Sequence, residues 1–243
     1  MFEDALAGFA RTVVVDEKRP VCRLTELLQD EVLDRLLLKV YGPHLVRDQL
    51  PVLVSQWMKY YAMQLIPPVV VASLGHGLGW PLGLDRLSFA LHEQGLLDGV
   101  RFEGAVIQES VSDDPFERFA PLLENLQQVI DRLSDYGDVP AAVLWGNAGD
   151  YLETCLRQLS AASDVSVVAG YGLLRERMTP DGLRNPLFQS VSYIEKDGQT
   201  VRQRRTCCLS HRVEWVGRCE HCPLGAAVSP ESPPDSTAAR PAR

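Results

Sequence analysis

The sequence predicts an α+β protein that is predominantly helical, with a small antiparallel sheet and a C-terminal hairpin that carries a cysteine motif. Three observations lead to this prediction. Apolar residues recur at helical spacing in several long segments, and short alternating segments are bounded by glycine and proline. The last alternating segment leads into two adjacent cysteines. With 243 residues, 46% of them hydrophobic, the chain can build a core without disulfides.

Two helices are predicted in the first third of the chain. Residues 23–40 place apolar side chains at helical spacing. A second helix over 44–66 is expected to end before the double proline at 67–68, since the residue before a proline disfavours helical backbone. The segment 69–74 is a buried strand or the start of another helix, and glycines and prolines predict a loop over 75–83.

The stretch from residue 60 to residue 84 contains no formally charged side chain. Its prolines and glycines would leave a lipid-exposed helix with unsatisfied backbone groups, so we expect buried core and no transmembrane segment. Peripheral contact with the inner face of a membrane stays open.

The middle of the chain mixes strands and helices. Residues 85–104 predict two strands, with a turn signal at Asp98-Gly99. Residues 115–135 and 140–160 predict helices that open on prolines, and a further helix is expected over about 164–177.

The C-terminal part begins with a predicted hairpin. SVSYIEK and QTVRQRR alternate on either side of Asp197-Gly198, which is typical of a tight turn. Residues 226–243 contain four prolines and no large aromatic residue, which indicates a disordered tail. We therefore expect one domain over 1–225, with its functional segment at about 186–225.

Composition and charge restrict the function classes. The first twenty residues have no basic segment followed by an apolar run, so we expect a cytoplasmic protein. Residues 1–174 carry a net charge of −11 and residues 175–243 one of +3. A basic region suggests nucleic acid first, but an overall charge of −8 and the lack of a nucleic-acid fold signature argue against it.

The cysteine motif reads C-C-x10-C-x2-C and consists of Cys207, Cys208, Cys219 and Cys222. A two-residue knuckle such as 219–222 suits zinc, whereas adjacent side chains on an extended strand point to opposite faces. A binuclear cluster relaxes that geometric demand. The spacing also differs from the ferredoxin patterns, and disulfides are rare in a reducing compartment.

RRTCC followed by C-x2-C-P resembles the C-terminal signature of the FhuF-type ferric-siderophore reductases. SQWMKYYAMQLIPP (55–68) and LWGNAGDYL (144–152) are also similar to that family. The resemblance implies a 2Fe–2S cluster held by Cys207, Cys208, Cys219 and Cys222. It also implies a cytoplasmic enzyme that gives one electron to an imported ferric siderophore.

Reduction suits such a substrate, which we expect to be of the hydroxamate type. Hard oxygen donors hold ferric iron far better than ferrous iron, so one added electron weakens the complex. GHGLGW lacks the G-x-G-x-x-G spacing, so a separate donor, either ferredoxin-like or a flavin reductase, is expected.

Several residues around the motif are candidates for a supporting role. The arginines either tune the cluster potential, dock an acidic donor or an anionic siderophore, or simply keep a strand edge solvated. His211 or His221 is placed to supply a proton, and Trp215 either shields the cluster, stacks on a substrate or packs. The arginines are Arg204, Arg205, Arg212 and Arg218.

Other conspicuous side chains are expected to be structural. Cys22 and Cys155 are interpreted as small buried apolar residues. Trp145, Gly146 and Asn147 open a helix, although they also lie in a segment that resembles the family. The aromatic residues Trp57, Tyr60 and Tyr61 are assigned to the core, and His76 lies in a glycine-rich loop that is a weaker candidate for ligand binding.

Two other classes of function stay open at this point. One is a non-catalytic protein that binds a siderophore or senses iron. The other is a structural protein stapled by zinc through the same four cysteines.

Overall fold

The structure is a computed structural model that describes residues 12–41, 47–108, 112–196 and 198–225. It is mostly helical, with small antiparallel sheets and a C-terminal hairpin before the cysteines, as predicted. The helices are α2 (Leu24–Leu27), α3 (Asp30–Tyr41), α4 (Leu50–His76), α5 (Pro115–Arg118), α6 (Ala120–Gly137), α7 (Ala141–Ala162) and α8 (Val168–Arg175). Short 3-10 turns span Arg47–Gln49, Leu84–Arg86 and Ser210–Arg212.

Three small sheets complete the fold. The strands are β1 (Cys22–Arg23), β2 (Leu78–Gly79), β3 (Leu87–Leu91), β4 (Leu97–Phe102), β5 (Ile107–Gln108), β6 (Val191–Lys196) and β7 (Gln199–Arg204). Their order is β1-β3-β4 in one sheet, and β2-β5 and β6-β7 form two-stranded pairs, all antiparallel.

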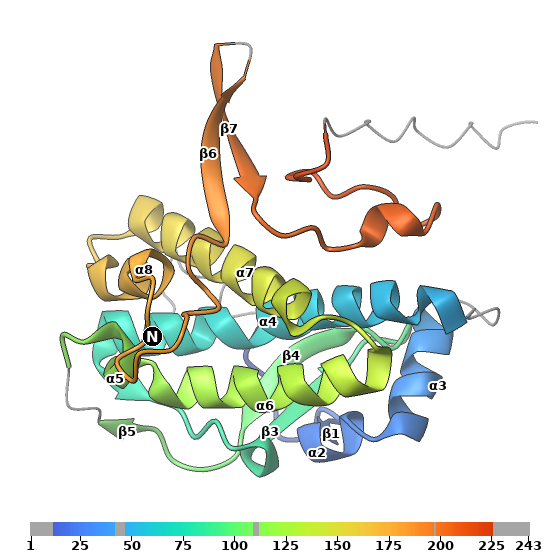
Figure 1. Ribbon diagram of the computed structural model, residues 1–243. Coiled ribbons are helices and arrows are strands. Elements are labelled where there is room, and N and C mark those ends of the chain that lie inside the picture. The colour runs from blue at the N-terminus through green and yellow to red at the C-terminus, as the bar shows by residue number, and fades with distance from the viewer. Residues whose placement is uncertain (1–11, 42–46, 109–111, 197, 226–243) are drawn as a thin grey trace, which may run out of the picture.

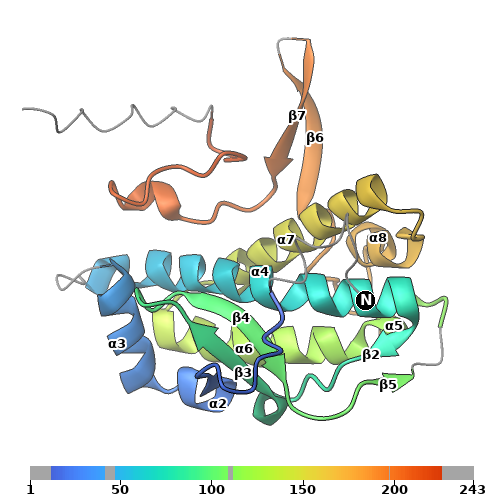
Figure 2. The ribbon, with the colours of Figure 1, turned by 180° about the vertical axis from the view of Figure 1, so that it is seen from behind.

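Helix α4 is the centre of the molecule. Figure 1 shows α6 in front of it and the three-stranded sheet behind, and Figure 2 shows the same arrangement from the other side. Helix α7 lies along α4, and residues of α4, α6, α7 and the sheet form one core. Trp57 and Tyr61 of α4 stack at 5.7 Å between ring centroids, and Tyr60 packs against the same core at its edge. The core assignment of these aromatic residues is confirmed.

Helix α4 corrects the prediction that a helix ends before Pro67. The helix runs through both prolines to His76, so residues 69–74 are helical and form no strand. A proline inside a helix costs about 3 kcal/mol. Here both prolines and most of their neighbours are buried, and the stabilisation from burying this apolar helix outweighs that cost. Of the predicted start, residues 44–46 lie outside the described residues.

Two other predicted boundaries are wrong. The helix predicted over 23–40 is broken between α2, which ends at Leu27, and α3, which begins at Asp30. Asp98-Gly99 lies inside β4, and the turn of that hairpin falls at residues 92–96, where His92 and Leu96 are hydrogen-bonded and Gly95 has a φ of 89°. Leu97 is thereby buried opposite Leu91, and Asp98 is free to pair with Arg19. Burial of the leucine outweighs the local turn preference.

The C-terminal hairpin is confirmed. Strands β6 and β7 pair from Val191 with Arg204 to Lys196 with Gln199, and Gly198 has a φ of 76°. Asp197 lies outside the described residues, as does the predicted tail at 226–243. Helix α7 matches the prediction over 140–160 closely, and α8 is shorter than the predicted 164–177. The predicted helix 115–135 is divided at Phe119 into α5 and α6.

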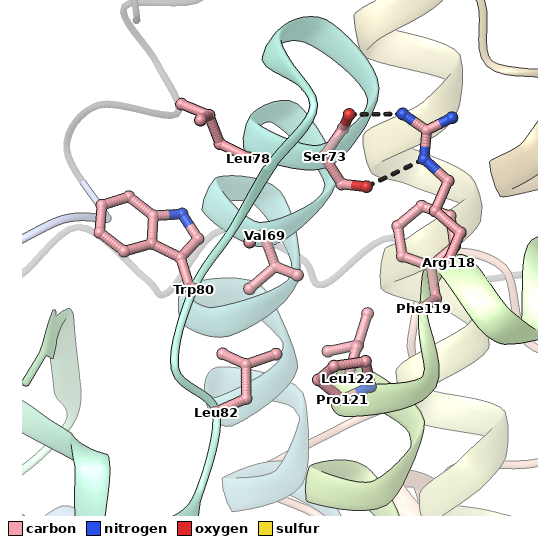
Figure 3. Close-up of a pocket in the computed structure, with 10 residues that line it drawn as sticks. Val69, Ser73, Leu78, Trp80, Leu82, Arg118, Phe119, Pro121 and Leu122 are labelled. Atoms are coloured by element: carbon pink, nitrogen blue, oxygen red, sulfur yellow. Dashed lines mark hydrogen bonds between the residues drawn. The ribbon is translucent and has the colours of Figure 1, made fainter. Parts of the chain in front are cut away.

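A small pocket lies between the C-terminal half of α4 and the start of α6 (Figure 3). Arg118 closes one side, where its Nε–H donates to Ser73 Oγ at 3.0 Å. The cavity volume is about 10 Å³, which is room for about one water molecule. Among the helices of the described ranges, none combines the length and the apolar character needed to cross a bilayer.

Candidate functional site

The four motif cysteines lie in a loop over residues 204–225, which we call the cysteine loop. It leaves β7 and crosses above the N-terminal halves of α4 and α7 (Figures 1 and 2). The loop has almost no regular structure besides one short turn at Ser210–Arg212. Its shape is therefore set by contacts with the helices below.

The adjacent cysteines have different surroundings. Cys207 Sγ lies 3.5 Å from His211 Nδ1 and accepts the N–H of Leu209 at 3.3 Å. Cys208 is buried, with its Sγ 3.2 Å from Ser210 Oγ. Leu209 has a φ of 65°, in the left-handed region, and this turn bends the chain just after the cysteine pair.

The structure brings together one thiol from each half of the motif, Cys208 and Cys219. A hydrogen bond from Cys219, helped by Lys59 and Ser210, lowers the pKa of Cys208 to about 3, and the same contact raises the pKa of Cys219. Cys222 is buried. In the ranges that the structure describes, no three His, Cys, Asp or Glu side chains are grouped for a metal ion. The structure thus pairs Cys208 with Cys219 and leaves Cys207 and Cys222 apart from them.

The chemistry of this loop fits an iron–sulfur cluster. All four cysteines are free thiols, and cysteine thiolates are the terminal ligands of 2Fe–2S clusters. The Arg204 N–H donates to His221 O at 2.9 Å, which joins the two halves of the loop. The Nε–H of Arg204 is buried and has no partner among the described atoms, so a donor is left over for an acceptor in this region.

The cysteine loop is anchored on α4 at the carbonyl oxygen of Cys208. Ser55 Oγ donates to this oxygen at 2.9 Å, and Gln56 Nε2 lies 3.5 Å from it. Asn147 of α7 is fully buried and donates to Ser55 O at 2.8 Å and to Ser55 Oγ at 2.9 Å. Two core helices therefore hold the backbone of one cysteine.

Arg204 extends this network to the hairpin. Its side chain is 2% exposed and donates to Asn147 Oδ1. Its Nη1 lies 3.5 Å from Asp150 Oδ2. The neighbouring Arg202 forms ion pairs at 2.7 Å with both Asp150 and Glu153 of α7. The start of the cysteine loop is thus fixed to α7 through two arginines and two carboxylates.

The remaining candidates near the motif are less confined. Arg205, Arg212 and Arg218 are exposed, and Arg205 lies 5.7 Å from the ring centroid of Phe188. Trp215 is 54% exposed, so it is not a buried packing residue. His211 faces Cys207, whereas the backbone of His221 accepts from Arg204.

The residues assigned to structural roles are largely where they were predicted. Cys155 is buried, whereas Cys22 is only half-buried and its Sγ lies 3.5 Å from Glu26 Oε2. His76 ends α4, about 30 Å from Ser55 at 1.5 Å per helical residue, so it lies far from the cysteine loop. Trp145 is buried near the start of α7.

Sequence reasoning missed Ser55, Lys59 and Asp150. Ser55 and Asp150 are small or common polar residues that show their role only through contacts with residues far along the chain. Lys59 had a signal, because it is the only Lys, Arg, Asp or Glu within α4.

A mostly helical protein whose loop carries four free thiols in this spacing belongs by class with the iron–sulfur proteins. A family model described as "Ferric iron reductase FhuF-like transporter" matches residues 55–201, and one described as "FhuF 2Fe-2S C-terminal domain" matches residues 204–224. The chain belongs to this FhuF-like ferric iron reductase family and carries its 2Fe–2S domain. The family resemblance and the cofactor are confirmed, and zinc is not the metal that the match assigns. None of the curated proteins compared with the chain matches it.

Proposed function

We propose that this ferric iron reductase acts on a ferric siderophore in the cytoplasm, with Cys207, Cys208, Cys219 and Cys222 as the ligands of its cluster. The single observation that supports the ligand set most is that the matched 2Fe–2S domain, residues 204–224, contains all four. When bound, the cluster supplies one electron at a time.

The protein's own residues hold and orient the ligands. Ser55 and Asn147 fix the backbone of Cys208, and Arg204 joins the two halves of the loop by its N–H. Burial of Cys208 and Cys222 keeps water from half of the thiols. His211, at 3.5 Å from Cys207, is placed to give a proton to a freed oxygen donor of the substrate.

The substrate class follows from coordination chemistry. Hydroxamate oxygens are hard donors that prefer ferric iron to ferrous iron. When the bound Fe(III) accepts one electron it becomes Fe(II), and the chelate loses most of its affinity. A hydroxamate siderophore is therefore the substrate that we propose.

A cavity beside the cysteine loop is where we place the chelate. Its volume is about 330 Å³, and it is lined by Ala142, Trp145, Arg184, Asn185, Pro186, Phe188, Arg205 and Thr206. Thr206 directly precedes Cys207. A cavity of about 440 Å³ near Gly77 is larger, but it lies at the far end of α4. Proximity to the cysteines decides between the two.

A separate protein supplies the electrons in this proposal. The chain has no glycine-rich dinucleotide motif, so a ferredoxin-like protein or a flavin reductase is the expected donor. The exposed Arg212 and Arg218 on the cysteine loop suit an acidic donor. Peripheral contact with a membrane stays a secondary part of the proposal.

Stopped-flow oxidation of the anaerobically reduced protein tests the function. We expect a ferric hydroxamate to oxidise the reduced protein faster than ferric citrate does, and visible absorption bands to report the centre. Cys219→Ser is expected to remove these bands, whereas Cys22→Ser, the matched control away from the motif, keeps them. Equal rates with both iron sources would favour a non-catalytic binder instead.

A further inference from the structure

Lys59 is the one formally charged side chain of α4, a helix of 27 residues whose neighbours are mostly buried and apolar. It is half-buried near the anchor of the cysteine loop. Lysine is rarely placed in such surroundings unless it is paired with an opposite charge. Its position therefore calls for a counter-charge.

The contacts of Lys59 lead to the cysteine loop. Its Nζ donates to Gln56 Oε1 at 3.0 Å, and Gln56 Nε2 lies 3.5 Å from the carbonyl oxygen of Cys208. Residues three apart share one face of a helix. The ammonium group thus lies on the face of α4 that the loop covers.

The protein provides no carboxylate for this ammonium group in the part that the structure describes. The salt bridges there belong to Arg19, Arg86, Arg132, Arg157, Arg202 and Arg204, and none includes Lys59.

The arginines beside the start of the cysteine loop already have carboxylate partners. Arg202 pairs with Asp150 and Glu153, Arg204 pairs with Asp150, and Arg157 lies 3.7 Å from Glu153. Each of these three arginines has a carboxylate partner, whereas Lys59 forms no salt bridge within the described ranges. A 2Fe–2S centre with four thiolates carries a charge of about −2 when oxidised and about −3 when reduced.

We propose that Lys59 is the counter-charge of the 2Fe–2S centre and a positioning residue that raises its midpoint potential. The physical reason is that a fixed positive charge stabilises the more negative, reduced form more than the oxidised form. This inference rests on the proposed ligand set. It ranks Lys59 above the four arginines around the motif as the group that sets the potential.

Redox titration of the purified, cluster-loaded protein, followed by visible absorption, tests the inference without any siderophore. Lys59→Gln is expected to lower the equilibrium constant for one-electron reduction by about tenfold, which is a shift of about 59 mV to more negative potential. Lys59→Arg keeps the charge and is expected to stay within about twofold of the wild type by the same relation. Lys18→Gln, an exposed lysine outside the site, is the matched control and is expected to leave the potential unchanged.

An unchanged potential in cluster-loaded Lys59→Gln would overturn the inference and leave the proposed function intact. Missing visible bands in the wild type would instead show that the ligand set is wrong. If Lys59→Gln loses the centre on purification, the Lys59→Arg variant decides between a role of the charge and a role of the side-chain shape. If Lys59→Arg keeps the cluster at the wild-type potential, the inference that the charge of Lys59 matters is supported. If both variants lose the cluster, the inference is overturned, because the shape of the lysine side chain and not its charge would be what the site requires.

Discussion

Cysteine thiols in this protein differ in acidity according to what surrounds them. Burial raises the pKa of Cys155 to about 12, and burial with the nearby Glu26 raises that of Cys22 to about 11. Cys208 has the opposite shift, because hydrogen bonds from Cys219 and Ser210 and the positive charge of Lys59 stabilise its thiolate. Metal binding requires the thiolate. The surroundings therefore distinguish Cys208, a candidate ligand, from Cys22 and Cys155, whose thiols stay protonated.

The Cys155→Ala variant is expected to lose less of its free energy of unfolding than the wild type does as the pH rises into the alkaline range. Because the folded-state pKa of Cys155 is raised, the folded protein keeps a proton that the unfolded chain loses above its ordinary pKa of about 9. The wild-type free energy of unfolding should therefore fall between pH 9 and 12 by about 1.4 kcal/mol per pH unit more than that of the variant. Urea denaturation at several pH values measures this slope, and parallel curves would contradict the assignment.

At the residue scale, the sequence alone supports only part of the candidate site. The spacing of Cys207, Cys208, Cys219 and Cys222 is specific enough to predict an iron–sulfur set. The contact between Ser55 and Asn147 could not be predicted, because they are 92 residues apart and become partners only when α4 and α7 pack. Arg204 was one of four equal candidates, and only its burial distinguishes it.

Among the elements, α7 depends on two small residues to let other segments come close. A Cβ at Gly146 would lie 2.8 Å from Thr206 Cβ, and one at Gly149 would lie 2.4 Å from Ser190 Cβ. Ser190 immediately precedes β6, and Thr206 immediately precedes the cysteines. These glycines set how closely the hairpin and the cysteine loop approach the helix.

Gly149→Ala is expected to destabilise the protein by about 1–3 kcal/mol, since the added methyl group overlaps Ser190. Gly75→Ala in α4 is the matched control, because its Cβ would meet only Val165 Cγ2 at an ordinary 3.8 Å. This control should leave stability equal or raised by up to about 1 kcal/mol. Thermal unfolding of both variants is the measurement, and equal melting temperatures would refute the close-approach argument.

Elements were predictable where one signal dominates. The β6–β7 hairpin has both alternation and a tight-turn signal, and both agree with the structure. Helix α4 was mispredicted because a local proline rule competed with burial on all sides, which only the packed structure reveals. The position of the turn before Leu97 was mispredicted for the same reason, since Asp98-Gly99 is a strong local turn signal that burial of Leu97 in the core outweighs.

On the scale of the whole molecule, a helical body and a projecting hairpin present the cysteine loop at one face (Figure 1). The fold class was predictable from composition and periodicity. The position of the loop was not, since it depends on contacts between residues about 150 positions apart, such as Ser55 with Cys208. The extent of the domain, 1–225, stays a prediction.

A chain that ends at Gly225 is expected to keep the fold and the centre. The matched 2Fe–2S domain ends at residue 224, and the contacts that anchor the cysteine loop involve residues 55–221. The melting temperature and the ratio of visible to ultraviolet absorption of the shortened protein should equal those of the full chain. A lower ratio would show that residues 226–243 contribute to the centre.

The anchor of the cysteine loop also has a consequence for the order of events during synthesis. Ser55 and Asn147 are translated before Arg204 and the motif cysteines, so the helices that receive the loop emerge from the ribosome first. The four motif thiols are therefore translated after the residues that hold the cysteine loop. We therefore expect iron and sulfide to be inserted after the helices below the cysteine loop have folded.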